Sequence, residues 1–196
     1  MNPRHITVFI VAALSVLSPG LAHAHTYGAM DAGFSQGFAH PFSGLDHLLA
    51  MVAVGLWAAQ MGGRALWLTP ASFVVMMAVG GLIGMSGVTL PQVELGIAGS
   101  VLALGALVAG AWRLPLFSAM SLAGLFALFH GLAHGAEMPQ ASDPALYGLG
   151  FVFATMVLHG IGMTTAFFAG SAMGARLARA GGCAIVIAGL VITVGA

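Results

Sequence analysis

The chain has 196 residues, of which 60% are hydrophobic and 5% are charged, and its mean hydropathy is +1.03. These values lie outside the range of soluble globular domains and predict an integral membrane protein. The net charge is zero and the chain has no lysine, which argues against a nucleic-acid partner. The single cysteine, Cys183, excludes an internal disulfide framework.

Residues 1–24 have the pattern of a cleaved signal peptide. A short polar segment precedes an apolar stretch at 6–17, and Ala22-His23-Ala24 fits the small-x-small cleavage pattern. Cleavage after Ala24 would leave His25 at the N-terminus, where its amine and imidazole would chelate a divalent cation together. Cleavage two residues earlier would leave His-Ala-His, with donors of the same kind. Alternatively, both histidines are polar residues that only flank the cleavage site.

Six apolar runs follow, and most are close to the roughly 20 residues that cross a bilayer. They cover residues 43–61, 66–86, 93–112, 115–135, 146–171 and 182–196, the last of them short. Segments with glycine, proline or arginine separate them. The predicted fold class is all-α: a polytopic membrane helix bundle of six transmembrane helices, in one domain at 25–196, after the signal peptide.

The charged residues predict how this bundle is oriented, because cytoplasmic loops are enriched in Lys and Arg. If the signal is removed outside the cytoplasm, the first span runs inward. The arginines then fall at cytoplasmic ends, namely Arg64, Arg113, Arg176 and Arg179, and the carboxylates Glu94, Glu137 and Asp143 fall at outer ends. We therefore expect a multi-pass protein with an external mature N-terminus and the lipid bilayer as a partner.

The 29 glycines indicate closely packed helices. Several pairs have the small-xxx-small spacing that lets transmembrane helices approach each other, namely Gly80 with Gly84, Gly131 with Gly135 and Gly170 with Gly174.

A first polar cluster ends the fourth run, at residues 129–137. If this segment is helical, His130, His134 and Glu137 project from one face, which is a metal-ligand spacing. Ionisable groups in hydrocarbon are costly, so their presence predicts a function. The alternative is a purely structural polar cluster.

A second polar cluster opens the first run and contains His40, Asp46 and His47. Pro41 suits the first turn of a helix, so the helix is expected to begin at residues 40–42 and to carry His47 about two turns beyond His40. Asp46 either ligates a cation directly or accepts the second ring N–H of a ligating histidine. By the orientation above, both clusters lie at the outer end. A structural role is again the alternative, as it is for His159 in the middle of the fifth run.

Imidazole and carboxylate ligands suit Ni²⁺, Co²⁺, Zn²⁺ or Cu²⁺, and the absence of a thiolate cluster argues against a Cu(I) site. A permeating ion favours several adjoining sites. We expect capture by His25 or His40, transfer to a site formed by the remaining cluster residues, and passage inward past His159. Protonation of imidazole competes with metal, so uptake should fall as the outside pH drops below about 6.5.

At these residues the chain resembles the HupE/UreJ family of bacterial inner-membrane nickel permeases, which are linked to hydrogenase and urease maturation. The resemblance rests on His40-x5-Asp46-His47 and Phe129-His130-Gly131-x-Ala133-His134-Gly135-x-Glu137, and it covers nearly the whole chain. It implies transport of Ni²⁺, with Co²⁺ as an alternative cargo, and no enzymatic activity or resident cofactor. It also implies cation binding by His40, Asp46, His47, His130, His134 and Glu137.

An intramembrane zinc hydrolase is the alternative function, with three histidines holding Zn²⁺ and Asp46 or Glu137 as general base. Six candidate ligands suit a path better than a closed catalytic site. A non-catalytic membrane subunit would leave the paired motifs without a cause. The phosphate-binding loop of ATPases is absent, so transport by this chain would be facilitated diffusion, ion-coupled exchange, or dependent on a partner. The sequence is compatible with one bound ion or two, and with a homo-oligomer.

Overall fold

The computed structural model describes residues 29–88, 90–139, 142–167 and 172–195, and the regular structure in these ranges is entirely α-helical. The helices are α2 (Ala29–Ser43), α3 (Leu45–Met61), α4 (Ala65–Met85), α5 (Val93–Gly110), α6 (Leu116–Glu137), α7 (Pro144–Phe167) and α8 (Ala172–Gly195). The predicted all-α membrane fold is confirmed. The predicted signal peptide, and His25 after it, lie outside the described residues.

Five of these helices, α4 to α8, are long and apolar enough to cross a membrane. The sixth candidate span is the pair α2 and α3, which is bent by 85°. Large apolar side chains on the outer surface fit this environment: Phe117 is 82% exposed and Val194 is 88% exposed. The count of six spans therefore holds when the bent pair is taken as one broken span.

Two boundaries predicted from the sequence were wrong. The first helix does not begin at residues 40–42, because α2 begins at Ala29 and holds Pro41 in its last turn. Pro41 has no backbone N–H for the i→i−4 bond, which weakens the helix at this point, and α2 ends two residues later. The last span is not short either, since α8 runs unbroken through Arg176 and Gly182 for 24 residues. Gly182 is retained inside this helix because it packs directly against the backbone of Ala109 in α5.

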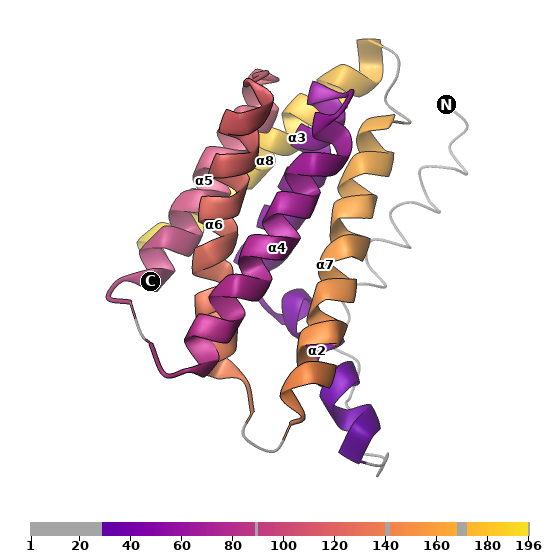
Figure 1. Cartoon of the computed structure of the whole chain (residues 1–196). Helices are drawn as coiled ribbons and strands as arrows, with labels where there is room; N and C mark the ends of the chain where they lie inside the picture. The colour runs from indigo at the N-terminus through magenta and orange to yellow at the C-terminus, as the bar shows by residue number, and fades with distance from the viewer. Residues whose placement is uncertain (1–28, 89, 140–141, 168–171, 196) are drawn as a thin grey trace, which may run out of the picture.

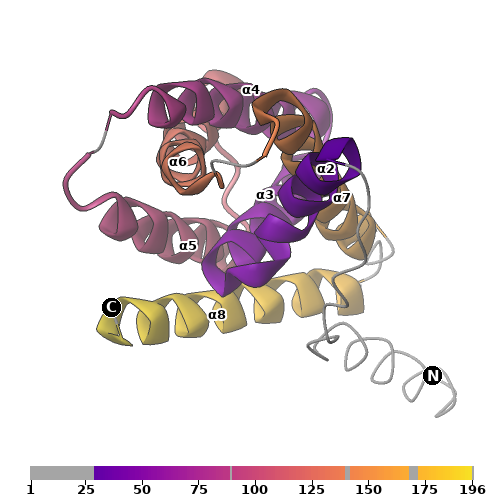
Figure 2. The same ribbon diagram turned by 90° about the horizontal axis from the view of Figure 1, so that it is seen from below.

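The helices pack around α3 (Figures 1 and 2). The most extensive contacts join α4 to α6, α5 to α8, and α7 to both α2 and α3. The middle and later turns of α3 are buried on all sides and supply much of the core, including Met51, Val54 and Trp57. Trp57 also donates its indole N–H to the carbonyl of Trp112 at 2.8 Å, which ties the end of α3 to the α5–α6 turn. These contacts hold α3, which carries Asp46 and His47, next to the turn that precedes α6, the helix of the first polar cluster.

Glycines let α4 and α6 approach to backbone contact. A Cβ at Gly84 would collide with the carbonyl of Leu132, and a Cβ at Gly131 would collide with the carbonyl of Met77. The predicted close packing at Gly80–Gly84 and Gly131–Gly135 is thus confirmed, whereas Gly170 lies outside the described residues. The same α6 segment carries His130 and His134, so the close approach also fixes the position of the site.

The two ends of the bundle differ in charge. We call one the arginine end; it comprises the α3–α4 turn with Arg64, the α5–α6 turn with Arg113, and the start of α8 with Arg176 and Arg179. The opposite end, at the bottom of Figure 1, comprises α2, the start of α3 and the end of α6, and we call it the histidine end.

Candidate metal-binding site

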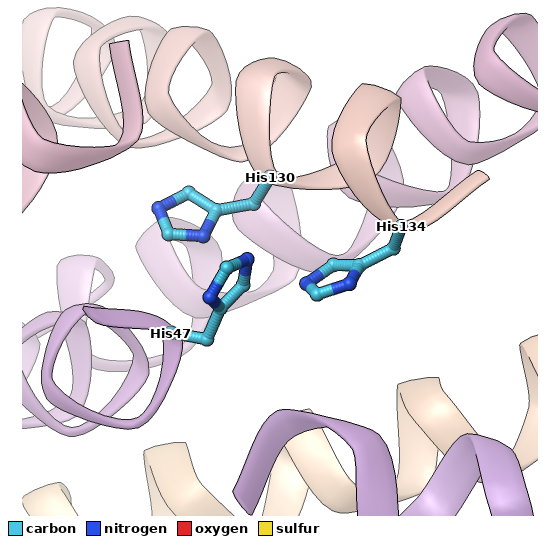
Figure 3. Close-up of side chains that lie close together, drawn as sticks. All are labelled: His47, His130 and His134. Atoms are coloured by element: carbon cyan, nitrogen blue, oxygen red, sulfur yellow. The ribbon is translucent and has the colours of Figure 1, made fainter. Parts of the chain in front are cut away.

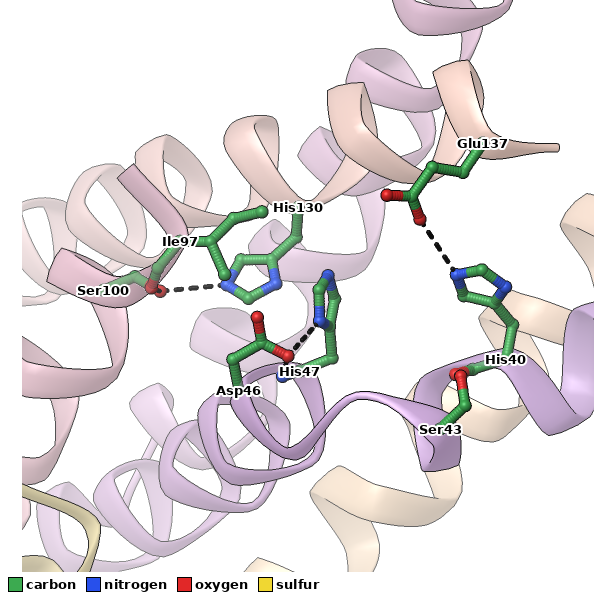
Figure 4. A network of polar contacts seen from close by, with 8 residues as sticks. All are labelled: His40, Ser43, Asp46, His47, Ile97, Ser100, His130 and Glu137. Atoms are coloured by element: carbon green, nitrogen blue, oxygen red, sulfur yellow. Dashed lines mark hydrogen bonds and ion pairs between the residues drawn. The ribbon is translucent and has the colours of Figure 1, made fainter. Parts of the chain in front are cut away.

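The bend between α2 and α3 brings the first polar cluster to the second. Gly44 lies at the bend with an extended backbone, at φ −104° and ψ 121°. A Cβ at Gly44 would stand 2.8 Å from Asp46 Oδ1 and 2.8 Å from His47 Nδ1. A glycine therefore leaves the room that the Asp46–His47 pair occupies. The bend also separates His40, on α2, from His47, on α3, so that they lie at different positions along the end of α6, His47 beside His130 and His40 beside Glu137 (Figure 4).

Asp46 orients His47. Its Oδ1 accepts the backbone N–H of His47 at 2.8 Å and lies 2.5 Å from the ring Nδ1. A carboxylate at this position accepts a hydrogen bond from Nδ1–H. The lone pair of the neutral imidazole is then on Nε2. Nε2 of His47 is buried and has no hydrogen-bond partner within the described residues. His47 thus presents a free ligand nitrogen, and Asp46 acts through it.

Ser100 orients His130 in the same way from α5. The Ser100 hydroxyl donates to the carbonyl of Ile97 at 2.6 Å and lies 2.9 Å from Nε2 of His130. Because a hydroxyl has one proton, Ser100 accepts from Nε2–H, and the lone pair of His130 is on Nδ1. Nδ1 is buried without a partner in the described part of the chain. Ser100, on α5 and outside both motifs, therefore determines which nitrogen of His130 is free to bind a cation.

His134 completes a three-histidine group (Figure 3). One ligand atom from each of His47, His130 and His134 can be chosen so that all lie within 4.8 Å of one another. The ring centroids of His47 and His134 are 4.1 Å apart, and those of His47 and His130 are 4.8 Å apart. Nitrogens that share one ion at about 2.1 Å stand roughly 3 to 3.5 Å from each other, so small ring rotations suffice.

A second group of three potential ligands lies beside the first and shares His134. It consists of His40, His134 and Glu137, again with ligand atoms within 4.8 Å. Nε2 of His40 lies 3.4 Å from Glu137 Oε2, and the Glu137 side chain is 55% exposed. Neither ring nitrogen of His134, which is only 4% exposed, has a partner within the described residues. His134 is thus available to both groups, the outer one with a carboxylate and the inner one all imidazole.

His159 lies apart from these groups, deeper in the bundle. Its Nδ1 donates to the carbonyl of Met51 at 2.8 Å, which leaves a buried Nε2 without a partner in the described chain. The ring of Phe73 lies close to both His130 and His159: its centroid is 5.8 Å from that of His130 and 5.2 Å from that of His159. An aromatic side chain thus adjoins both the inner histidine group and His159.

The structure brings together six of the eight residues that the sequence singled out, from three helices: His40, Asp46, His47, His130, His134 and Glu137. His159 is separate, and His25 is outside the described residues. Sequence reasoning missed Ser100 and Phe73, and also Tyr147, whose ring centroid is 5.9 Å from that of His40. Ser100 had a usable signal, because it is the single hydroxyl side chain in the apolar run 93–112.

The sequence model of the HupE / UreJ protein family matches residues 11–192 of the chain. The chain belongs to the HupE/UreJ family. It is also 45% identical over 185 residues to the curated protein HupE of Rhizobium leguminosarum bv. viciae, a match that covers 94% of this chain and 95% of that protein. No solved structure matches the chain. Both histidine clusters of this HupE/UreJ member lie within the matched residues.

Proposed function

We propose that this HupE/UreJ member is an inner-membrane permease that imports Ni²⁺, with Co²⁺ as an alternative cargo, and supplies hydrogenase or urease maturation. The observation that carries the proposal is the pair of three-ligand groups that share His134. Imidazole and carboxylate donors suit borderline divalent ions, and the implied cargo of the family narrows these to nickel and cobalt.

Two adjoining groups support transport because a permeating ion must bind and then leave. The outer group offers an exposed carboxylate, Glu137, which attracts a hydrated cation. The inner group offers three mostly buried imidazoles. His134 belongs to both, so an ion can exchange His40 and Glu137 for His47 and His130 without leaving this ligand. The step inward passes Phe73 and reaches the free Nε2 of His159.

The hydrolase alternative needs a general base beside a zinc-bound water. Both candidate carboxylates already have partners: Asp46 lies 2.5 Å from His47 Nδ1, and Glu137 lies 3.4 Å from His40 Nε2. Asp46 therefore orients a ligand, and Glu137 belongs with His40 to the outer ligand group. These roles support a binding path more than a catalytic centre.

The test is radioactive nickel uptake by cells that lack other nickel importers. His47→Ala and His130→Ala each remove an inner ligand, and we expect uptake to fall at least about tenfold, the lower range for losses at metal sites. Ser118→Ala is the matched control, since Ser118 is an exposed residue on the same helix as His130. Membrane amounts of each variant are measured by immunoblot. Normal uptake in both histidine variants would overturn the site.

A further variant tests the inner step. His159→Ala leaves the outer and the inner ligand group intact, so purified protein should still bind Ni²⁺ while cells take it up more slowly. Uptake equal to that of the unaltered protein would remove His159 from the path. Turnover of a peptide or lipid substrate without uptake would instead support the hydrolase.

A further inference from the structure

The arginine end of the bundle carries four positive charges. The sequence has five carboxylate side chains, and they belong to Asp31, Asp46, Glu94, Glu137 and Asp143. These residues lie in or next to the starts of α2, α3, α5 and α7 or at the end of α6, toward the histidine end. Among the described residues, no carboxylate side chain therefore lies at the arginine end to balance the arginines.

Two of these arginines line a common pocket of about 220 Å³ at the arginine end. Arg113 comes from the α5–α6 turn and Arg179 from α8, and the end of α3 contributes Gln60. Much of the remaining wall is alanine, from α3, the α5–α6 turn, α7 and α8. The small side chains leave space directly beside two guanidinium groups.

The guanidinium groups in this pocket have unused donors. Arg179 donates its Nε–H to the carbonyl of Ala109 at 2.8 Å, and the described residues offer its terminal nitrogens no further partner. Arg113 has no hydrogen bond or ion pair within the described part of the chain. The amide nitrogen of Gln60 is occupied, because it donates to the carbonyl of Val108 at 3.0 Å. The arginines are thus the groups in this pocket that are free to hold an anion, and guanidinium matches phosphate oxygens in geometry.

The level of the pocket along the membrane normal indicates which kind of phosphate compound would reach it. All three tryptophans of the chain lie near the arginine end, on the last turns of α3, the first turn of α4 and the α5–α6 turn. Trp67 is 67% exposed and Trp112 is 59% exposed. Exposed tryptophans gather at the headgroup level of a bilayer. Arg113, which lines the pocket, follows Trp112 in the sequence. The pocket therefore lies at the level of lipid phosphates.

We propose that the pocket between Arg113 and Arg179 binds the phosphate of an anionic phospholipid headgroup. This site is separate from the histidine groups, and the proposal does not depend on the transported ion. A headgroup held there would join α8 to the α5–α6 turn through its phosphate. Basic pockets of this kind between transmembrane helices are known sites for anionic headgroups.

The test is native mass spectrometry of the purified full-length protein with phosphatidylglycerol and, separately, with zwitterionic phosphatidylethanolamine. The unaltered protein should retain more phosphatidylglycerol. Arg113→Gln and Arg179→Gln should each weaken its binding about fivefold, the effect of one arginine near an anionic surface. Arg176→Gln is the matched control, because Arg176 is exposed on the same helix but does not line the pocket. It should bind as the unaltered protein does.

Arg179→Gln also removes the bond to Ala109, so this variant can lose stability for another reason. Arg113→Gln breaks no contact in the described chain and decides the matter if Arg179→Gln fails to fold. Equal retention of the two lipids by the unaltered protein would overturn the proposal, as would an equal loss in Arg176→Gln. Displacement of phosphatidylglycerol by inorganic phosphate would overturn the lipid assignment in favour of a soluble phosphate compound.

Discussion

At the scale of single residues, the candidate site is a set of lone pairs with fixed directions. Asp46 accepts a hydrogen bond from Nδ1–H of His47, and Ser100 accepts one from Nε2–H of His130. Each contact selects the tautomer whose free nitrogen points to the shared group. Partners of this kind raise ligand basicity and hold the ring in position. His134, whose ring nitrogens have no partner within the described residues, is the ligand that both groups share.

Ser100→Ala tests the role of the hydroxyl. Without it, His130 loses the acceptor that fixes its tautomer, and we expect nickel affinity of the purified protein to fall about 10- to 100-fold. Isothermal titration with Ni²⁺ measures this directly. Ser100→Thr keeps a hydroxyl and should restore part of the affinity, a rescue that a purely structural role of Ser100 would not produce. Unchanged affinity in Ser100→Ala would show that the contact does not orient a ligand.

A second residue-scale prediction concerns pH. Each ligating imidazole must offer a neutral lone pair to bind a cation, so protons and Ni²⁺ compete for the same nitrogen. The nickel affinity of the purified protein should therefore decrease as the pH is lowered and recover when the pH is restored. Isothermal titration with Ni²⁺ over a series of pH values provides the measurement. An affinity that was the same at every pH at which the protein stays folded would contradict ligation by histidine.

The residue types of the site could be predicted from the sequence, but its partners could not. Helical spacing alone places His130, His134 and Glu137 on one face. Ser100 is 30 residues away from His130, and nothing in the spacing of α5 relates it to α6. In the sequence, Phe73 does not differ from the other apolar residues of its helix. Such contacts depend on tertiary packing, which local patterns do not encode.

At the scale of helices, close backbone packing sets the position of the histidines. The α4–α6 contact is made by glycines on both helices, and each would collide with a partner carbonyl if it had a side chain. The small-xxx-small spacing predicted this contact correctly. The sequence did not predict the bend at Gly44, because Pro41 fits a helix start as well as a helix end. Pattern alone does not choose between these positions.

Gly84→Ala tests the link between this packing and the site. The added methyl group would meet the backbone of Leu132 and lie 3.0 Å from Ala136 N, so α4 and α6 must separate. We expect a loss of about 1 to 3 kcal/mol in stability and reduced nickel uptake. Gly99→Ala is the control, because a Cβ there meets nothing within 4 Å. Thermal unfolding in detergent compares the two, and equal midpoints would contradict the role of this contact.

At the scale of the whole molecule, the charges divide the bundle into two ends. The sequence predicted this division from loop arginines alone, and the helix order places those arginines at one end. It erred only in treating residues 176–182 as a break, since a helix accommodates arginine near its first turns and glycine where a neighbour packs closely. The orientation of the two ends in the membrane is a prediction of the positive-inside rule.

Cysteine labelling tests this orientation. Cys183 is first replaced by alanine, because it is the single native thiol and is exposed. Ser86→Cys then places a thiol after α4, on the side of the histidine end, and Ala175→Cys places one near the start of α8, at the arginine end. A membrane-impermeant maleimide added to intact spheroplasts should label Ser86→Cys and leave Ala175→Cys unlabelled until the cells are lysed. The reverse pattern would put the histidine groups on the cytoplasmic side, where they would receive nickel that leaves the cell, and the proposed direction of transport would have to be reversed.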